Sequence, residues 1–240
     1  ILNQRLSHAY IFYGNRGCGK EAFSIELAKA LNCSHEQKRP CQECSSCRKI
    51  SNFQHPDVKY IFPVSKQLTS DEISGLLKSK AQNPFLDLPV SGYRNIAIEA
   101  IRDLKSEAKY APFEAKKRVF IISGAEFFSR EAANSFLKLL EEPPENLLLI
   151  LTTNDLNALL DTIRSRCQPV HFPRFSDIQI KEIITRYHKI EQDLLPLIRI
   201  AQNDIKRVFE ILQEDLENRR KSVHTFLRAI ASSNYFKIFD

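Results

Sequence analysis

Residues 9–20 read AYIFYGNRGCGK, a short apolar run that leads into a glycine-rich loop. The glycines and the lysine fit the first seven positions of the P-loop pattern G-x-x-x-x-G-K-[ST], in which backbone N–H groups turn inward around phosphates and the lysine reaches the terminal ones. Apolar residues at helical spacing follow from Lys20 to Leu31, so the positive end of a helix would face the same loop. A strand, a glycine loop and a helix in this order predict the opening of a nucleotide-type α/β domain. The predicted phosphate-binding residues are Gly14, Gly17, Gly19 and Lys20.

The eighth position of the pattern holds Glu21, where a working P-loop has a Ser or Thr whose hydroxyl ligates Mg²⁺. A carboxylate at this position is larger, and its charge opposes the phosphates that it would face. The same chemistry needs an acidic pair at the end of a neighbouring buried strand. The strand expected at 119–122 is instead followed by Ser123 and Gly124, and Glu126 comes too late. These departures predict that the chain does not hydrolyse ATP and that magnesium–nucleotide binding is lost or weakened.

Strand and helix patterns alternate through most of the chain. Apolar runs at 57–62, 119–122 and 147–151 are typical of buried strands, and helical spacing marks 98–108 and 130–142. The run at 147–151 ends in Thr-Thr-Asn, so it supplies no acid either. This alternation predicts an α/β fold, with a parallel sheet flanked by helices on both faces.

The character of the sequence changes after about Pro173, where strand patterns become rare and amphipathic helical patterns dominate. We expect a P-loop-type α/β domain over 1–173, with a cysteine module inserted at 33–47, and a small helical lid domain over 174–217. A further change near Asn218 predicts that 218–240 is the start of a third, helical domain that is cut short.

Four of the six cysteines gather in one short polar stretch. In a chain without a secretory signal, such clustering favours a metal over disulfides. Four thiolates suit tetrahedral Zn²⁺, and an all-cysteine shell leaves no open position, so the site would be structural. Free surface thiols or a redox dithiol explain this density less well, and His35 and His55 flank a shell that the cysteines already fill. The predicted zinc ligands are Cys33, Cys41, Cys44 and Cys47.

The composition is that of a globular protein with a mild basic excess. The 240 residues carry a formal net charge of +6, with 43% hydrophobic and 27% charged residues. This excess permits contact with nucleic acid or an acidic partner without requiring either. The chain has no apolar run of membrane-spanning length, and its first residues lack the order of a signal peptide. We therefore expect a cytoplasmic protein without membrane contact.

Further motifs give the chain a family resemblance. Leu6-Ser-His-Ala-Tyr10 precedes the P-loop, Leu137-Lys-Leu-Leu-Glu-Glu-Pro-Pro144 ends the helix expected at 130–142, and Ser165-Arg-Cys167 follows the last strand pattern. Together with the P-loop and the cysteine module after its helix, these motifs resemble the bacterial clamp-loader subunits of the AAA+ class. The resemblance covers about residues 6–172.

The resemblance implies a place within that family. The gamma/tau clamp-loader subunit is the ATPase motor, whereas the delta-prime subunit keeps the fold and loses the nucleotide chemistry. Glu21, Ser123-Gly124, His55-Pro56-Asp57 and Ile61-Phe62-Pro63 resemble the delta-prime type. A subunit of that type is implied to join gamma/tau and delta-type subunits in a hetero-oligomeric ring. The ring loads the sliding clamp onto primed DNA during replication by DNA polymerase III.

The resemblance also implies a role for Arg166. In this family the Ser-Arg-Cys arginine reaches across a subunit interface to the γ-phosphate of a neighbour's ATP, where a guanidinium stabilises charge in the phosphoryl-transfer transition state. Asn154 lies where the first sensor of the family is expected, and Lys206-Arg207 lies near the second. We expect both sensors to be vestigial.

Two other interpretations stay open. A motor subunit with unusual ligands would use Glu21 on Mg²⁺ and Glu126 to position water. A zinc-dependent binding module on an inert scaffold would take no part in replication.

Overall fold

The computed structural model describes residues 6–65, 68–88, 94–187 and 193–213, together with residue 228. Within them the strands are β1 Ala9–Tyr13, β2 Val58–Ile61, β3 Arg118–Ile122, β4 Leu147–Thr153 and β5 Gln168–His171. The helices there are α1 Lys20–Asn32, α2 Ser45–Ser51, α3 Ser70–Gln82, α4 Ile98–Ala108, α5 Arg130–Glu141, α6 Asp161–Arg164, α7 Asp177–Tyr187, α8 Leu195–Ile200 and α9 Ile205–Gln213.

The strands form one parallel sheet in the order β2-β3-β4-β1-β5. β1 lies between β4 and β5, with Ile11 opposite Leu151 on one side and Pro169 on the other. Because the strands are parallel, the carboxyl ends of β1, β3 and β4 meet at one edge of the sheet. Open α/β sheets bind their ligands at this edge.

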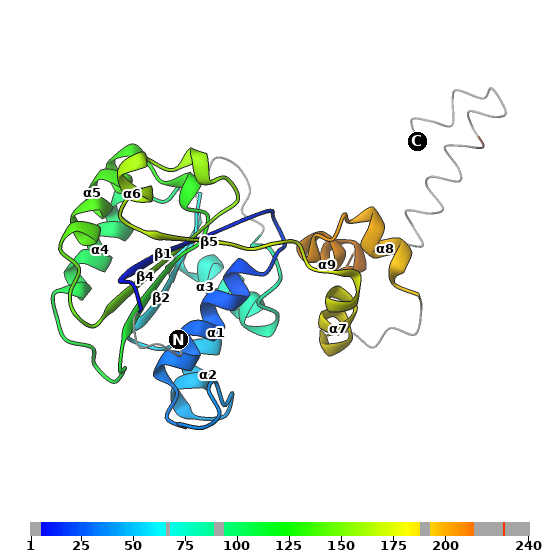
Figure 1. The fold of residues 1–240 in the computed structure, drawn as a ribbon, viewed down its shortest axis with the longest axis horizontal. Helices are drawn as coiled ribbons and strands as arrows, with labels where there is room; N and C mark the ends of the chain where they lie inside the picture. The colour runs from blue at the N-terminus through cyan, green and yellow to red at the C-terminus, as the bar shows by residue number, and fades with distance from the viewer. Residues whose placement is uncertain (1–5, 66–67, 89–93, 188–192, 214–227, 229–240) are drawn as a thin grey trace.

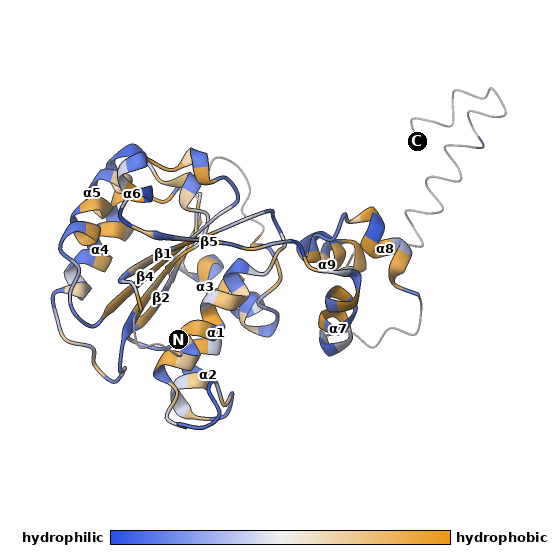
Figure 2. Cartoon of the chain, viewed as in Figure 1, coloured by the Kyte–Doolittle hydropathy of each residue, from blue (hydrophilic) through white to orange (hydrophobic). Residues whose placement is uncertain are grey.

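Alternate side chains of each strand pack on opposite faces of the sheet. Ile11 and Phe120 join a core with α4 and α5, whereas Phe12 and Ile121 join a second core with α1 and α2. β3 and β4 are buried throughout and apolar over most of their length, as the orange strands in Figure 2 show. In Figure 1, α4, α5 and α6 lie on one side of the sheet, and α1, α2 and α3 on the other.

The helices α7, α8 and α9 stand apart from the sheet, beyond the end of β5 (Figure 1). We call these helices, within residues 177–187 and 193–213, the lid. The lid has its own core, which includes Ile180, Ile198 and Phe209. Phe85 and Leu86, in the segment after α3, pack against that core, so the lid contacts the α/β part of the chain.

The sequence-based prediction of an α/β fold with a helix-flanked parallel sheet is confirmed. The sequence does not predict β5, α2 or α3. β5 is an exposed edge strand that includes Pro169, and α3 buries only Lys80, so neither has a clear apolar pattern. Residues 188–192 and 214–217 of the predicted lid domain lie outside the described residues, and so does the predicted third domain at 218–240 apart from residue 228. Among the described residues, no helix is long and apolar enough to cross a bilayer.

Candidate nucleotide-type site and cysteine module

The loop between β1 and α1 has the backbone shape of a P-loop. Gly17 has a positive φ of 73°, which favours glycine, and a Cβ on Gly14 would lie 2.3 Å from the carbonyl oxygen of Phe172. The loop leads directly into α1, whose first residue is Lys20. The first-turn N–H groups of the helix therefore face the loop. The structure brings the predicted residues Gly14, Gly17, Gly19 and Lys20 together in one turn.

The Lys20 ammonium turns back into this loop. It donates to the carbonyl oxygens of Gly14 and Asn15, both at 2.7 Å, and to Asn154 Oδ1 at 3.2 Å. Lys20 is buried, and burial lowers its pKa. An ammonium has three N–H donors, and these acceptors suffice to engage all of them. A phosphate would therefore have to displace one of the acceptors.

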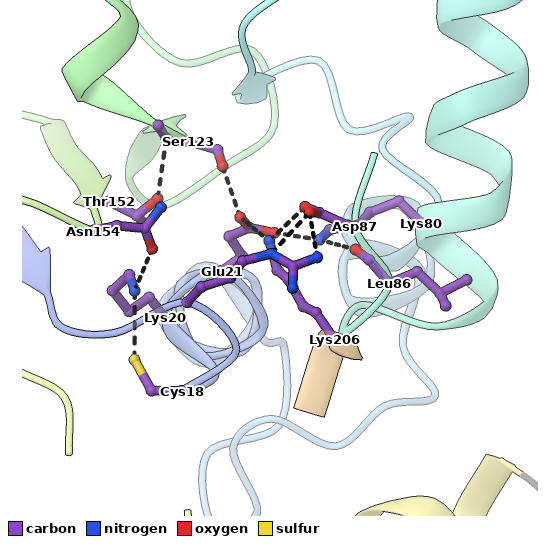
Figure 3. A network of polar contacts seen from close by, with 12 residues as sticks. Cys18, Lys20, Glu21, Lys80, Leu86, Asp87, Ser123, Thr152, Asn154 and Lys206 are labelled. Atoms are coloured by element: carbon purple, nitrogen blue, oxygen red, sulfur yellow. Dashed lines mark hydrogen bonds and ion pairs between the residues drawn. The ribbon is translucent and has the colours of Figure 1, made fainter. Parts of the chain in front are cut away.

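Glu21 lies at the centre of a buried ion network (Figure 3). One of its carboxylate oxygens pairs with Lys80 of α3, and the other accepts from Lys206 of α9 and from the Ser123 hydroxyl, both at 2.9 Å. Burial opposes ionisation of Glu21, but the charges of Lys80 and Lys206 outweigh it and hold its pKa well below the usual range. Glu21 is therefore ionised at neutral pH and already paired with two cations.

The segment after α3 extends this network. Asp87 accepts from Lys206 at 2.8 Å, and Lys80 also donates to the carbonyl oxygen of Leu86 at 2.6 Å. Burial raises the pKa of Asp87, but Lys206 and Arg16 outweigh it, so the net shift is downward. Asp87 is thus a second anion shared between the P-loop side and the lid.

Arg16 ties the tip of the P-loop to the lid. Its guanidinium donates to Asp87 at 2.9 Å, to Asp204 at 2.9 Å, and to Glu210 of α9. Arg207, which lies near the predicted second sensor, pairs with the same Glu210 at 3.0 Å. Sequence reasoning did not single out Arg16, Asp87 or Lys80, because their types are ordinary and their partners are distant in the chain.

Asn154 and Glu126 lie at the opposite side of the pocket. The Glu126 carboxylate accepts from the backbone and side-chain N–H groups of Asn154 at 3.2 and 3.0 Å. Asn154, predicted as the first sensor, therefore contacts Lys20 and Glu126, while Lys206, near the predicted second sensor, contacts Glu21. Both predicted sensors are engaged within the chain.

Arg166 lies on the exposed surface just before β5. Its guanidinium donates to the carbonyl oxygen of Thr162 at 3.0 Å and pairs with Glu141 of α5 at 3.1 Å. The two paired side chains are 38% and 48% exposed, so the pair is open to solvent. The described residues that line the P-loop pocket do not include Arg166. Since Glu141 belongs to the motif at 137–144, this ion pair joins two of the motifs that carry the resemblance.

The four cysteines predicted as metal ligands gather beyond the C-terminal end of α1. Cys33 is the C-cap of α1, Cys44 is the N-cap of α2, and Cys47 lies in the first turn of α2. The backbone N–H groups of Cys44 and Cys47 point at the sulfurs of Cys41 and Cys44, at 3.3 and 3.5 Å. N–H groups aimed at sulfur stabilise the thiolate, which is the form that binds metal.

The arrangement fits one tetrahedral ion such as Zn²⁺. The ligand atoms of Cys33, His35, Cys41 and Cys44 all lie within 4.8 Å of one another, and Cys47 packs in the same cluster. Sulfurs bound to one zinc at about 2.3 Å lie about 3.8 Å apart, so small movements suffice. Burial raises the pKa of Cys47 to about 12, whereas hydrogen bonds outweigh burial at Cys44 and lower its pKa to about 5. His35, which we expected to lie outside the shell, belongs to this set of four, whereas the predicted ligand Cys47 does not.

Comparison with known proteins places the chain in a family. Residues 1–176 match the family model described as DNA polymerase III, delta subunit. The chain belongs to this family. The clamp-loader relationship expected from the motifs is thereby confirmed.

The relatives include both delta' and tau subunits of DNA polymerase III. DNA polymerase III subunit delta' of Bacillus subtilis is 33% identical over 232 residues, which cover 94% of this chain and 60% of the relative. Subunit tau of the same organism is 32% identical over 191 residues, covering 79% of this chain and 28% of the relative. The chain therefore spans three fifths of the delta' relative and a smaller part of tau.

Two solved structures match most of the chain. The ORC1 protein of Aeropyrum pernix, solved with DNA, has a TM-score of 0.50 at 15% identity, covering 91% of this chain and 56% of that one. A gamma-subunit-related protein of Thermotoga maritima has a TM-score of 0.48 at 20% identity, covering 92% of this chain and 62% of that one. The ORC1 likeness concerns the fold alone.

Proposed function

We propose that the chain is a delta-prime-type clamp-loader subunit that does not hydrolyse ATP. In this role it joins gamma/tau and delta-type subunits in a cytoplasmic ring, helps to load the sliding clamp onto primed DNA, and supplies Arg166 to a neighbour's ATP. The proposal goes further than family membership, because it assigns the chain to one branch and gives it a role within the complex.

The observation that carries the proposal is the state of the Glu21 carboxylate. A motor subunit needs a hydroxyl at this position for Mg²⁺ and an acid at the end of the neighbouring strand. Glu21 instead pairs with Lys80 and Lys206 and accepts from Ser123, which occupies that strand end. A magnesium ion or a phosphate entering here would have to break buried ion pairs.

The exposure of Arg166 supports the role in trans. Its guanidinium contacts the carbonyl oxygen of Thr162, the Ser165 hydroxyl at 3.4 Å, and Glu141 in an exposed ion pair. Such pairs contribute less than about 1 kcal/mol. A neighbour's phosphate can therefore compete for the guanidinium at little cost. Zn²⁺ in the cysteine module would have a structural role, since at least four donors surround the site.

The experiment replaces Arg166 in the full chain and measures ATP turnover of a complex reconstituted with gamma/tau and delta-type subunits. Arg166→Ala is expected to remove the contribution of one ATP site while leaving assembly intact by size-exclusion chromatography. Arg164→Ala, at the half-buried last residue of α6 and two residues before Arg166, is the matched control and should leave turnover unchanged. Equal turnover of the wild-type and Arg166→Ala complexes would show that the arginine has no role in trans.

A motor subunit is the second candidate, because tau relatives match most of the chain. It requires Glu21 to bind Mg²⁺ and Glu126 to position water. Hydrolysis of ATP by the isolated chain with Mg²⁺, abolished in Glu126→Gln, would establish it. Failure of the chain to join the ring would instead favour a zinc-dependent binding module on an inert scaffold.

A further inference from the structure

Two lysines from separate elements converge on one carboxylate inside the P-loop pocket. Lys80 comes from α3, on the α/β side, and its side chain is 0% exposed. Lys206 comes from α9 of the lid, and its side chain is 14% exposed. Each binds a different oxygen of Glu21, whose own side chain is 16% exposed. Glu21 is therefore the shared anion between the lid and the body of the chain.

A carboxylate in this place resembles part of a phosphate group. Both present oxygen acceptors with negative charge, and both accept short charge-assisted hydrogen bonds from lysine. In a P-loop the cations around the loop are arranged for phosphate oxygens. Here the two oxygens of Glu21 already take a lysine each, one from α3 and one from α9, and Figure 3 shows both lysines beside the Glu21 carboxylate.

We propose that Glu21 is an internal substitute for a nucleotide phosphate, and that through Lys206 it holds the lid on the P-loop without any nucleotide. This inference goes beyond the proposed function, because it concerns the isolated chain and requires no ring and no neighbour. The lid is then held on the P-loop whether or not a nucleotide is present.

The lid is also seated directly on the loop. The N–H of Ile205, the first residue of α9, points at the carbonyl oxygen of Gly17 at 3.4 Å. A Cβ on Gly17 would lie 1.9 Å from Asp204 Oδ1, and one on Gly19 would lie 2.5 Å from the Phe175 ring. Gly17 thus lets the lid approach the loop to van der Waals contact, and Gly19 does the same for Phe175, just before the lid. The ion network fixes that approach.

The two lysines can be separated by mutation, because only Lys206 belongs to the lid. Removing Lys206 takes away the contribution of the lid to Glu21 but leaves the buried pair of Glu21 with Lys80 intact. Removing the charge of Glu21 leaves the buried Lys80 ammonium without its ion-pair partner, although Lys206 keeps its pair with Asp87. This is costlier than losing an exposed pair, because a buried charge is left uncompensated. Both changes should release α9, while β4, which touches neither lysine, keeps its protection.

The test is backbone hydrogen exchange of the full chain without nucleotide, for Lys206→Met, Glu21→Gln and the control Glu99→Gln, an exposed glutamate of α4. In both network variants the amides of α9, with that of Ile205, are expected to exchange about tenfold faster or more, and those of β4 at the wild-type rate. Glu99→Gln should match the wild type throughout. If Glu21→Gln fails to fold, Lys206→Met decides, because it keeps the Glu21–Lys80 pair.

Unchanged exchange of α9 in Lys206→Met would overturn the proposal. A second arm adds Mg·ADP to the wild-type chain, where α9 is expected to show the same protection with and without the nucleotide. A tenfold or larger gain in protection of α9 with Mg·ADP would also overturn it, because the lid would then close on nucleotide and not on Glu21.

Discussion

The Ser123 hydroxyl donates to the Glu21 carboxylate at 2.9 Å, and this contact joins the two positions at which the chain departs from an ATPase. In a P-loop ATPase a hydroxyl on the loop and a carboxylate at the strand end hold Mg²⁺ together. Here the carboxylate is on the loop and the hydroxyl is at the strand end, so the two groups have exchanged places. A direct hydrogen bond stands where a metal-bridged contact would be.

Reversing this exchange is expected to create nucleotide binding. In the double variant Glu21→Thr with Ser123→Asp, the hydroxyl and the acid return to the positions that hold Mg²⁺, and the carboxylate that opposes the phosphates is gone. We expect Mg·ADP to bind the variant in isothermal titration calorimetry, with little or no binding by the wild type at about 1 mM, where a free energy near −4 kcal/mol is detected. Ser123→Asp alone, which sets two carboxylates side by side, is the control and should not bind.

An absence of binding in the double variant would contradict this account, provided that the variant folds as judged by circular dichroism. Equal binding by the wild type would contradict it more directly, because Glu21 would then be compatible with the phosphates.

The sequence predicted the parts of this site that are local in the chain. The P-loop glycines and Lys20 lie within one turn, and Glu21 and Ser123 are each recognised as departures from a short pattern. The ion network around Glu21 could not be predicted from the sequence, because Lys80 lies 59 residues from Glu21 along the chain and Lys206 lies 185 residues away. Buried lysines carry no apolar signature, so nothing in α3 marked Lys80 as an interior residue.

The strands of the sheet also differ in how far their own sequence predicts them. The buried strands β3 and β4 are recognisable as apolar runs, because both of their faces are covered. β5 is a short edge strand held by pairing with β1, and pairing between distant segments leaves no pattern in either one. In the cysteine module the spacing predicted the cluster, but only the fold brings His35 to it.

Loss of a cysteine from the cluster is expected to lower both the bound zinc and the free energy of unfolding. Cys41→Ser removes one sulfur from the group that surrounds the predicted zinc, so a chain purified with about one Zn²⁺ should lose most of it. Because metal binding free energy is part of the folding free energy of such modules, we expect the unfolding free energy to fall by roughly 4 kcal/mol or more. Metal analysis and chemical denaturation measure the two effects.

Cys167→Ala is the matched control for this change. Cys167 is a buried cysteine whose pKa burial raises to about 12, and it lies outside the cluster. Its loss should leave the metal content unchanged. Normal metal content in Cys41→Ser would show that His35 replaces the lost sulfur.

Two glycines in opposite settings test how closely the lid approaches the P-loop. Gly17 has a φ of 73°, and a Cβ there would meet Asp204 at 1.9 Å, so Gly17→Ala is expected to destabilise the fold by about 1–2 kcal/mol or more. Gly75 lies inside α3, and a Cβ on it would have nothing within 4 Å, so Gly75→Ala should stabilise by about 0.5–1 kcal/mol. Thermal unfolding of both variants measures the difference, and equal melting temperatures would contradict the close approach.

A buried carboxylate supports the loop that precedes β3. Asp57 is fully buried and pairs with Arg118 at 2.9 Å. Its two oxygens also accept the backbone N–H groups of Phe113, Glu114 and Ala115 at 2.8, 2.8 and 2.9 Å. Burial raises the pKa of Asp57, but these donors outweigh it and lower the pKa from 3.8 to about 2.

This shift makes part of the stability of the protein depend on pH. Because the folded pKa lies below the unfolded value, the contribution of Asp57 is complete above about pH 4 and is lost as the pH falls toward 2. It amounts to about 2 kcal/mol, and Asp57→Asn should lose it at neutral pH. Urea unfolding at pH 7 and at low pH measures this, with Asp103→Asn, an exposed aspartate of α4, as the control. The free energies of wild type and Asp57→Asn should converge as the pH falls toward 2, and a constant difference between them would show that the role of Asp57 does not depend on its charge.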